Sequence, residues 1–167
     1  EQPIAAARKA LEIAKAAKCM TVLNPAPSAP LDDSIYALCD FITPNESEAS
    51  MLSGVTVKDE SSARKAGDFF LKKGVGAAVI TLGEKGALLH SKAQSQEISP
   101  YQAGKVVDTT GAGDAFNGGF AAALARGEAP LKAARFGCAT AGISVTRPGT
   151  APSMPSRAEI EALLAKS

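Results

Sequence analysis

The class of fold is decided by the stretch Ala77-Ala78-Val79-Ile80-Thr81-Leu82 and by the turn that follows it, Gly83-Glu84-Lys85-Gly86. The first six residues form a nearly continuous apolar run of strand length, which is typical of a strand in a sheet covered on both faces. The turn then leads the chain into a second strand over residues 87–90. We therefore predict a buried sheet built around these strands.

Helical patterns and short apolar runs alternate on both sides of this stretch. Upstream, the spacing predicts buried strands over 19–23 and 40–43 and helices over 4–17, 31–39, 44–54 and 59–73. Downstream we expect an edge strand within 91–105, the end of an apolar strand at 106–107, helices over 114–126 and 130–144, and a last helix opened by the capping box Ser156–Glu159. Helices that alternate with buried strands predict an α/β fold with a mainly parallel sheet.

Composition narrows the class of protein. The chain has 167 residues, of which 46% are hydrophobic and 21% charged, and 18 basic residues stand against 17 acidic ones. This size and balance predict a single domain over residues 1–167, without the charge excess that binds nucleic acid or the apolar run that crosses a membrane. The start lacks the pattern of a secretory signal, so we expect a cytoplasmic protein. Cys19, Cys39 and Cys138 are expected to be reduced, buried thiols.

The segment Asp108-Thr109-Thr110-Gly111-Ala112-Gly113-Asp114 is the one that indicates chemistry. It places small residues where a strand end should meet the first turn of a helix. The backbone N–H groups of Gly111, Ala112 and Gly113 can point at one spot there, and the helix dipole adds to their attraction for an anion. The carboxylate of Asp114 can then take a proton from a hydroxyl that attacks a bound phosphoryl group. On these residues alone, a tight turn capped by an acidic side chain is the alternative interpretation.

Five motifs in order resemble one family of enzymes. The stretch from Asp108 to Phe120 closely resembles the C-terminal signature of the ribokinase-like sugar kinases, also called the PfkB family. Four further stretches are similar to motifs of that family: Asn24–Pro27, Thr43–Glu48, Thr81–Gly86 and Arg147–Pro155. The resemblance runs from Glu1 to the last helix and covers the rear half of such an enzyme. It implies a three-layer α/β/α fold whose sheet is incomplete on its N-terminal side.

The resemblance also implies a reaction. The family transfers the γ-phosphoryl group of ATP to a sugar hydroxyl, here the 5-hydroxyl of D-ribose, with Mg²⁺ and K⁺ as cofactors. By this resemblance Asp114 is the general base, and the amides of Gly111, Ala112 and Gly113 form the anion hole. The sugar is contacted by Asp114 and Glu1.

The same resemblance implies residues for the nucleotide and the cations. ATP is contacted by Asn45, Thr81, Gly83 and Gly113, and Mg²⁺ is contacted by Glu48 through water. K⁺ is held by a set of six residues from two stretches of the chain: Asp108, Thr110, Ser144, Arg147, Gly149 and Ser153.

Several of these residues have a purely structural interpretation as well. Asn45 and Glu48 have the spacing of a helix cap, and Asp108 can tie down its own turn. Gly118 and Gly119 stand inside a predicted helix at a cost of about 1 kcal/mol each relative to alanine, which indicates close packing against a neighbouring helix. The only histidine, His90, is expected at the surface without a catalytic role.

Two alternatives to a ribose kinase stay open. One is a kinase of the same family that acts on another sugar or a nucleoside, and the other is a non-catalytic nucleotide-binding domain. A dinucleotide oxidoreductase is rejected because the glycine spacing fails at Gly118, and a P-loop kinase because the sequence has no Gly-x-x-x-x-Gly-Lys-[Ser/Thr]. The complete enzyme is expected to take a small sugar and ATP and is compatible with a homodimer. We expect the 167 residues alone to be inactive.

Overall fold

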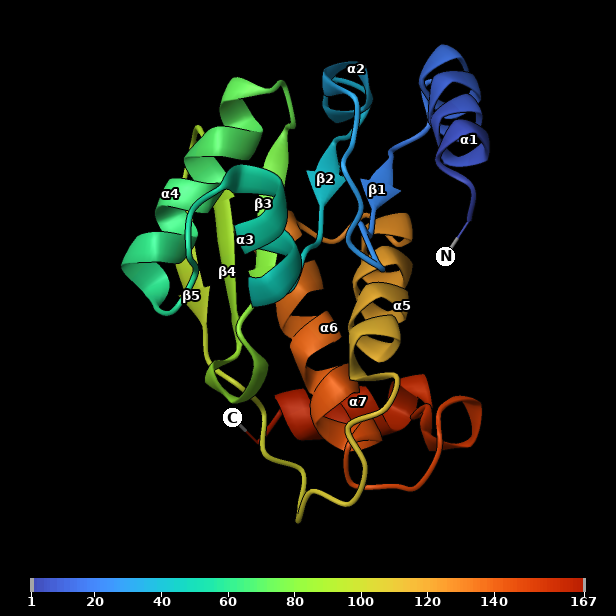
Figure 1. Cartoon of the computed structure of the whole chain (residues 1–167). Coiled ribbons are helices and arrows are strands. Elements are labelled where there is room, and N and C mark those ends of the chain that lie inside the picture. Colours follow the sequence, from blue (N-terminus) through green and yellow to red (C-terminus); the bar gives the residue numbers. More distant parts are fainter. Residues whose placement is uncertain (1, 167) are drawn as a thin grey trace. The chain divides into compact units, whose positions relative to one another are not determined.

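The computed structural model describes residues 2–166 of the chain, which form two compact units. Unit 1 contains the chain up to Gly83 together with Leu88–Gln96, and unit 2 contains Glu84–Ala87 together with the chain from Glu97 onward. Figure 1 shows the elements coloured along the sequence. Each unit is described by itself, and the single domain over residues 1–167 stays a prediction.

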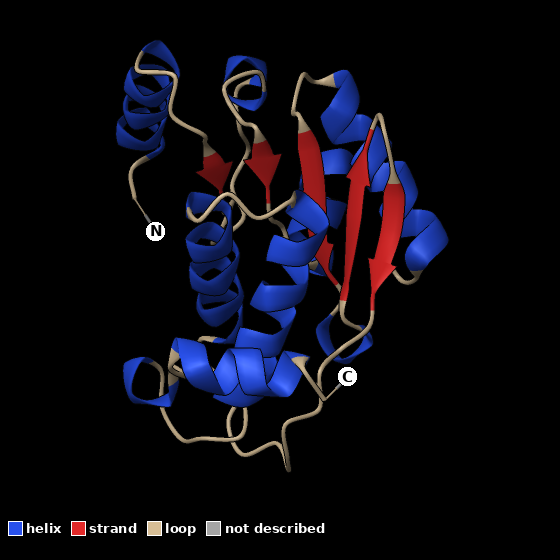
Figure 2. Ribbon diagram, turned by 180° about the vertical axis from the view of Figure 1, so that it is seen from behind, coloured by secondary structure: helices blue, strands red, loops and turns tan. Residues whose placement is uncertain are grey.

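Unit 1 is built on a sheet with the strand order β1-β2-β3-β4-β5. Its strands are β1 (Val22–Leu23), β2 (Phe41–Ile42), β3 (Ala77–Thr81), β4 (Ala87–Ser91) and β5 (Ser95–Ile98). The first residue of β4 and the last two residues of β5 belong to unit 2. The first three strands are parallel, with Val22 opposite Phe41 and Phe41 opposite Ala77. β4 follows β3 after the short 3-10 turn η1 (Gly83–Lys85) and runs in the opposite direction (Figure 2). The predicted parallel sheet around residues 77–82 is confirmed.

The helices of unit 1 are α1 (Ile4–Ala16), α2 (Asp33–Tyr36), α3 (Glu46–Ser53) and α4 (Glu60–Lys72). Helices α3 and α4 pack against β3, and the core between helices and strands includes Ile35, Ile42, Phe70 and Ile80, each at most 2% exposed. Tyr36 and Phe70 add an aromatic contact with ring centroids 6.0 Å apart. The expected helices over 4–17, 44–54 and 59–73 are confirmed within one or two residues at each end.

Strands β1 and β2 are shorter than the predicted 19–23 and 40–43. The backbone N–H of Thr21 donates to Asp40 Oδ2 at 2.8 Å, and the N–H of Asp40 donates to Thr21 Oγ1 at 2.9 Å. Because side chains accept these two amide protons, the main-chain pairing of β1 with β2 begins one residue after Thr21 and Asp40. The N–H of Phe41 donates to the Thr21 carbonyl at 3.0 Å. The helix predicted over 31–39 likewise shrinks to Asp33–Tyr36.

His90 is not the surface residue that the sequence suggested. Its side chain is only 12% exposed, and its ring lies within hydrogen-bond distance of Asp68 Oδ1 at 3.0 Å and of Ser95 Oγ at 2.7 Å. The ring also covers Gly67, where a Cβ atom would lie 2.5 Å from His90 Cδ2. His90 therefore joins α4 to the β4–β5 hairpin.

Unit 2 is a helical unit formed by α5 (Ala112–Ala125), α6 (Pro130–Ser144), the 3-10 turn η2 (Ala151–Ser153) and α7 (Arg157–Leu164). Helices α5 and α6 pack closely, because a Cβ at Gly119 would lie 2.3 Å from Thr140 Oγ1 and a Cβ at Gly137 would lie 2.9 Å from the Phe116 carbonyl oxygen. Close packing is confirmed at Gly119. It is wrong for Gly118, where a Cβ would meet no atom of the described residues within 4 Å.

Two further expectations are corrected. Residues 106–107 do not form a strand: Val106 and Val107 are 57% and 60% exposed, and the N–H of Val107 donates to the Val145 carbonyl at 2.8 Å instead of to a sheet. Cys19 is exposed, because it lies in the loop between α1 and β1, whereas Cys39 and Cys138 are buried as predicted. Burial raises the pKa of both buried thiols to about 12. Within residues 2–166, no helix combines the length and the apolar character that a bilayer span requires.

Candidate functional site

The segment Asp108–Asp114 leads directly into α5. Gly111 is the residue before the helix and adopts the left-handed conformation, with φ of 76° and ψ of 8°. A side chain would be strained there, and a Cβ would also lie 3.2 Å from Thr150 Cγ2. Glycine at 111 thus serves both the turn and the close approach of the loop that contains Thr150.

The N-terminus of α5 presents main-chain donors, but fewer than predicted. Among the described residues, the N–H groups of Gly111 and Gly113 donate to no acceptor, whereas the N–H of Ala112 donates to the Thr109 carbonyl at 3.2 Å. The prediction of three open amides is therefore wrong for Ala112, because the turn uses that donor. Gly113 is exposed, and a Cβ there would meet nothing within 4 Å. The position can thus accept an anion next to the exposed Asp114.

Asp108 joins this turn to a distant loop. Its Oδ1 accepts the N–H of Thr110 at 2.9 Å, and its Oδ2 accepts the N–H of Gly149 at 3.0 Å. Hydrogen bonds from Thr110, and then from Gly149, hold the pKa of Asp108 below its ordinary value, so the carboxylate is ionised at neutral pH. The turn-stabilising interpretation and the predicted proximity to the loop are both confirmed.

The segment from Ser144 to Ser153 carries the other residues of the predicted cation set. The hydroxyls of Ser144 and Ser153 are buried and donate to the carbonyls of Ala141 at 2.9 Å and Thr150 at 2.6 Å. The N–H groups of Val107 and Asp108 both donate to the Val145 carbonyl, at 2.8 and 3.2 Å. The two stretches of the set therefore lie side by side in unit 2.

The atoms that this set offers as ligands fit an alkali cation such as K⁺. The available ligands are oxygens: one ionised carboxylate, two hydroxyls whose protons are already donated, and main-chain carbonyls of a turn-rich loop. Hard oxygen ligands of this kind suit alkali and alkaline-earth ions rather than zinc or copper. The residues could hold K⁺, and that role stays a prediction.

Unit 1 contains three of the four predicted nucleotide residues, at the carboxyl ends of β2 and β3, whereas the fourth, Gly113, lies in α5 of unit 2. Asn45 and Thr81 form an isolated parallel bridge, and the N–H of Thr81 donates to the Pro44 carbonyl at 3.0 Å. Gly83 lies two residues beyond Thr81, at the same strand end. Ligands commonly bind at the carboxyl ends of parallel strands, which is where these three residues lie.

Asn45 and Glu48 form a capping box at the start of α3, as their spacing suggested. Asn45 Oδ1 accepts the N–H of Glu48 at 2.9 Å, and Glu48 Oε2 accepts the N–H of Asn45 at 2.9 Å. Glu48 is 7% exposed and one carboxylate oxygen is used in the cap, so it fits Mg²⁺ through a water molecule better than as a direct ligand. In the part of the chain that the structure describes, no group of three or more His, Cys, Asp or Glu side chains is arranged to hold a metal ion.

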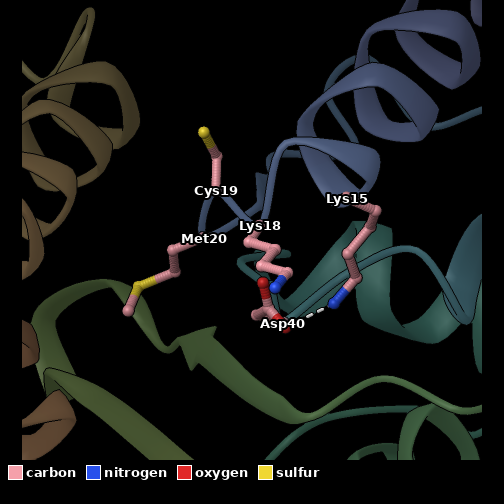
Figure 3. A pocket seen from close by; sticks show the side chains of 5 residues that line it. All are labelled: Lys15, Lys18, Cys19, Met20 and Asp40. Atoms are coloured by element: carbon pink, nitrogen blue, oxygen red, sulfur yellow. Dashed lines mark hydrogen bonds and ion pairs between the residues drawn. The ribbon is translucent and has the colours of Figure 1, made fainter.

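A shallow hollow of about 480 Å³ in unit 1 contains none of the predicted site residues. It is lined by Lys15, Lys18, Cys19, Met20 and Asp40 (Figure 3). Lys15 Nζ donates to Asp40 Oδ1 at 2.6 Å, while Asp40 Oδ2 accepts from Thr21. Asp40 therefore uses Oδ1 to hold α1 through Lys15 and Oδ2 to hold Thr21, the residue before β1, which gives this side chain a structural role.

Two residues that contact the predicted site were missed in the sequence. Thr150 packs on Gly111, and Glu159 pairs with Arg147. The capping box Ser156–Glu159 was a visible local signal, but nothing in the spacing indicated that its carboxylate also reaches Arg147. The predicted sugar contact Glu1 lies outside the described residues.

The fold and the loop define an α/β protein with an anion-accepting helix N-terminus beside an oxygen-rich loop. The chain belongs to the pfkB family of carbohydrate kinases, whose sequence profile matches residues 1–157. The ribokinase-like fold predicted from the motifs is thereby confirmed.

Individual relatives agree with this assignment. A ribokinase of Haemophilus influenzae is 46% identical over 159 residues, which are 95% of this chain and 52% of that protein. A deoxyribokinase of Salmonella typhi is 37% identical over 148 residues, covering 88% of this chain and 48% of that protein. The structure of Arabidopsis thaliana ribokinase complexed with ribose and ATP matches with a TM-score of 0.94 at 31% identity, over 99% of this chain and 54% of that one. The chain thus spans about half the length of the relatives it matches.

Proposed function

We propose that the protein containing this chain is an ATP-dependent sugar kinase that phosphorylates the 5-hydroxyl of D-ribose. The observation that carries the proposal is the start of α5, where two N–H groups without an acceptor stand next to the exposed carboxylate of Asp114. The similarity to ribokinases over almost the whole chain supports ribose as the acceptor.

Asp114 acts as the general base in this proposal. It accepts the proton of the sugar hydroxyl as that oxygen forms its bond to the γ-phosphorus, while the bond to the leaving oxygen of ADP breaks and its electron pair stays on ADP. The N–H groups of Gly111 and Gly113, together with the dipole of α5, stabilise the negative charge on the transferred group. Because Ala112 donates to Thr109, it contributes to the shape of this anion hole and not to its donors.

The remaining predicted residues bind and orient the nucleotide and the cations. Asn45, Thr81 and Gly83 contact ATP, and Glu48 orients water on Mg²⁺, which neutralises phosphate charge when bound. Asp108, Thr110, Ser144, Arg147, Gly149 and Ser153 would hold K⁺, which supplies positive charge beside the turn that presents Gly111. The bonds from Thr110 and Gly149 to the Asp108 carboxylate support this assignment.

A kinase of the same family with another acceptor is the second candidate. The similarity to a deoxyribokinase favours it specifically, because 2-deoxyribose differs from ribose by one hydroxyl. A phosphotransfer panel of ribose, deoxyribose, fructose and nucleosides, with and without KCl, decides between these acceptors.

The base assignment is tested with Asp114→Asn in the full-length protein. We expect turnover to fall by about 10²- to 10⁴-fold because the amide cannot take the proton, while ATP affinity stays nearly unchanged. Glu128→Gln, an exposed acidic position beyond the other end of α5, is the matched control and should keep full activity. An Asp114→Asn enzyme with normal turnover refutes the base, and a wild-type protein that phosphorylates nothing in the panel refutes the kinase.

A further inference from the structure

The carboxylate of Glu159 joins the two ends of the loop between α6 and α7. Its Oε1 accepts a hydrogen bond from Nη2 of Arg147, at the start of the loop. Its Oε2 accepts the N–H of Ser156 at 2.8 Å and the hydroxyl of Ser156 at 2.8 Å, at the end of the loop. One side chain of α7 thus closes the segment 147–156, which we call the clasp loop.

The middle of the clasp loop contacts the segment that leads into α5. The N–H of Gly149 donates to Asp108 Oδ2, and Thr150 packs on the position of Gly111 that must remain without a side chain. Asp108 in turn holds the N–H of Thr110, the residue before Gly111. Glu159 therefore holds Arg147, which is two residues from Gly149 along the loop, and Gly149 in turn contacts Asp108, which holds the turn before α5; all of these residues belong to unit 2.

The Arg147–Glu159 pair is too exposed to matter much for stability. The two side chains are 35% and 45% exposed, and ion pairs in such positions contribute little to the free energy of unfolding. The pair instead restricts the geometry of the clasp loop, whose middle residues belong to the proposed K⁺ site or contact Gly111. Groups that orient metal ligands in this way typically change metal affinity or activity by about 10- to 100-fold when they are removed.

We propose that Glu159 is a positioning residue, which holds the clasp loop against the Asp108 turn and thereby sets the arrangement of the cation-binding oxygens and of the Gly111 amide. The part of this proposal that concerns K⁺ and turnover rests on the proposed kinase function. The part that concerns the loop geometry does not.

Helix α7 offers a matched control for the test. Glu161 pairs with Arg157 at 2.6 Å on the same helix, with side chains 51% and 64% exposed, and among residues 2–166 its carboxylate has no hydrogen bond or ion pair with the clasp loop. Glu159→Gln and Glu161→Gln both remove one carboxylate from an Arg–Glu pair of α7. Glutamine at 159 can still accept the N–H of Ser156, so the start of the helix is kept while the charge that holds Arg147 is lost.

The first measurement is hydrogen exchange of the full-length protein, which does not require activity. In Glu159→Gln we expect peptides that contain the Thr110 and Gly149 amides to exchange roughly tenfold faster, with no change in Glu161→Gln. Equal exchange in the two variants overturns the proposal. It does so whether or not the protein is a kinase.

The second measurement is the KCl concentration for half-maximal phosphotransfer. We expect Glu159→Gln to need roughly tenfold more KCl and to regain its kcat at saturating KCl, a rescue that a general loss of stability would not show. Arg147→Gln should have the same effect, and the double variant should be no worse than either single one. Additive effects, or a loss of kcat that KCl does not restore, overturn the proposal. If the wild-type protein shows no phosphotransfer, the proposed kinase function is refuted. If the same protein shows faster exchange in Glu159→Gln, the role of Glu159 in loop geometry is still supported.

Discussion

Asp108 and Glu159 each use both carboxylate oxygens to connect a local turn with a distant residue. The local half of each arrangement was predictable, because an aspartate often binds an amide two residues on, and Ser156–Glu159 has the spacing of a capping box. The distant half was not, because Gly149 is 41 residues from Asp108 and Arg147 is 12 residues from Glu159. No periodicity encodes such pairings.

The pKa of Glu159 predicts how stability depends on pH. Main-chain and side-chain hydrogen bonds from Ser156, and then the bond from Arg147, lower the pKa of Glu159 from 4.5 to about 2. The ionised group therefore stabilises the fold, mainly through its bonds from Ser156 and only slightly through the exposed pair with Arg147. This contribution is complete above about pH 5 and is lost as the pH falls toward 2. Urea unfolding from pH 6 to pH 3 should show wild-type and Glu159→Gln protein converging in stability at the acidic end. A gap that stays constant or widens on acidification would contradict the assignment.

The two adjacent glycines of α5 predicted its close packing against a neighbouring helix, but not which of them makes the contact. Two adjacent glycines indicated that something approaches α5 closely, but successive residues of a helix point about 100° apart. Which glycine faces the neighbour depends on the orientation of α5 relative to α6, and only Gly119 does so.

The two glycines predict opposite stability effects. Gly119→Ala should destabilise by about 1–3 kcal/mol, because the new Cβ would overlap Thr140 Oγ1, which also donates to the Phe136 carbonyl. Gly118→Ala should stabilise by about 0.5–1 kcal/mol, because its Cβ meets no neighbour and alanine loses less backbone entropy than glycine. The free energy of unfolding of each variant, from urea titration, checks both signs. Equal effects at the two positions would show that the helix orientation is wrong.

The chain passes between the two units three times, at residues 83/84, 87/88 and 96/97. Neither unit is therefore one continuous stretch of sequence. Unit 2 depends on the short segment Glu84–Ala87, since a Cβ at Gly86 would lie 2.0 Å from the Ile98 carbonyl oxygen. Boundaries of this kind leave no signal in composition, so the sequence alone could not have located them.

This topology predicts the behaviour of a nicked protein. Lys92 is exposed in the turn between β4 and β5, so limited trypsin treatment should cut there. The two pieces on either side of Lys92 should elute together on native size exclusion, because β5 stays paired with β4 and Gly86 stays packed on Ile98. They should separate in urea. Separation without denaturant would contradict the topology, and Lys92→Gln, which cannot be cut at this turn, is the control.

The amino-acid sequence alone determined the α/β class, most helix positions, the capping boxes and the segment that we propose binds an anion. Hydrophobic period, glycine placement and cap spacing act over a few residues, so they can be read locally. Long-range geometry decided the rest. The Thr21–Asp40 hydrogen bonds shorten strands β1 and β2. The N–H of Val107 binds the Val145 carbonyl instead of a sheet, and Cys19 is exposed. The clasp loop was brought to Gly111 by contacts with Asp108 and Glu159. These features depend on which donors and acceptors meet after the chain has folded, and residues far apart in sequence acquire those partners only in three dimensions.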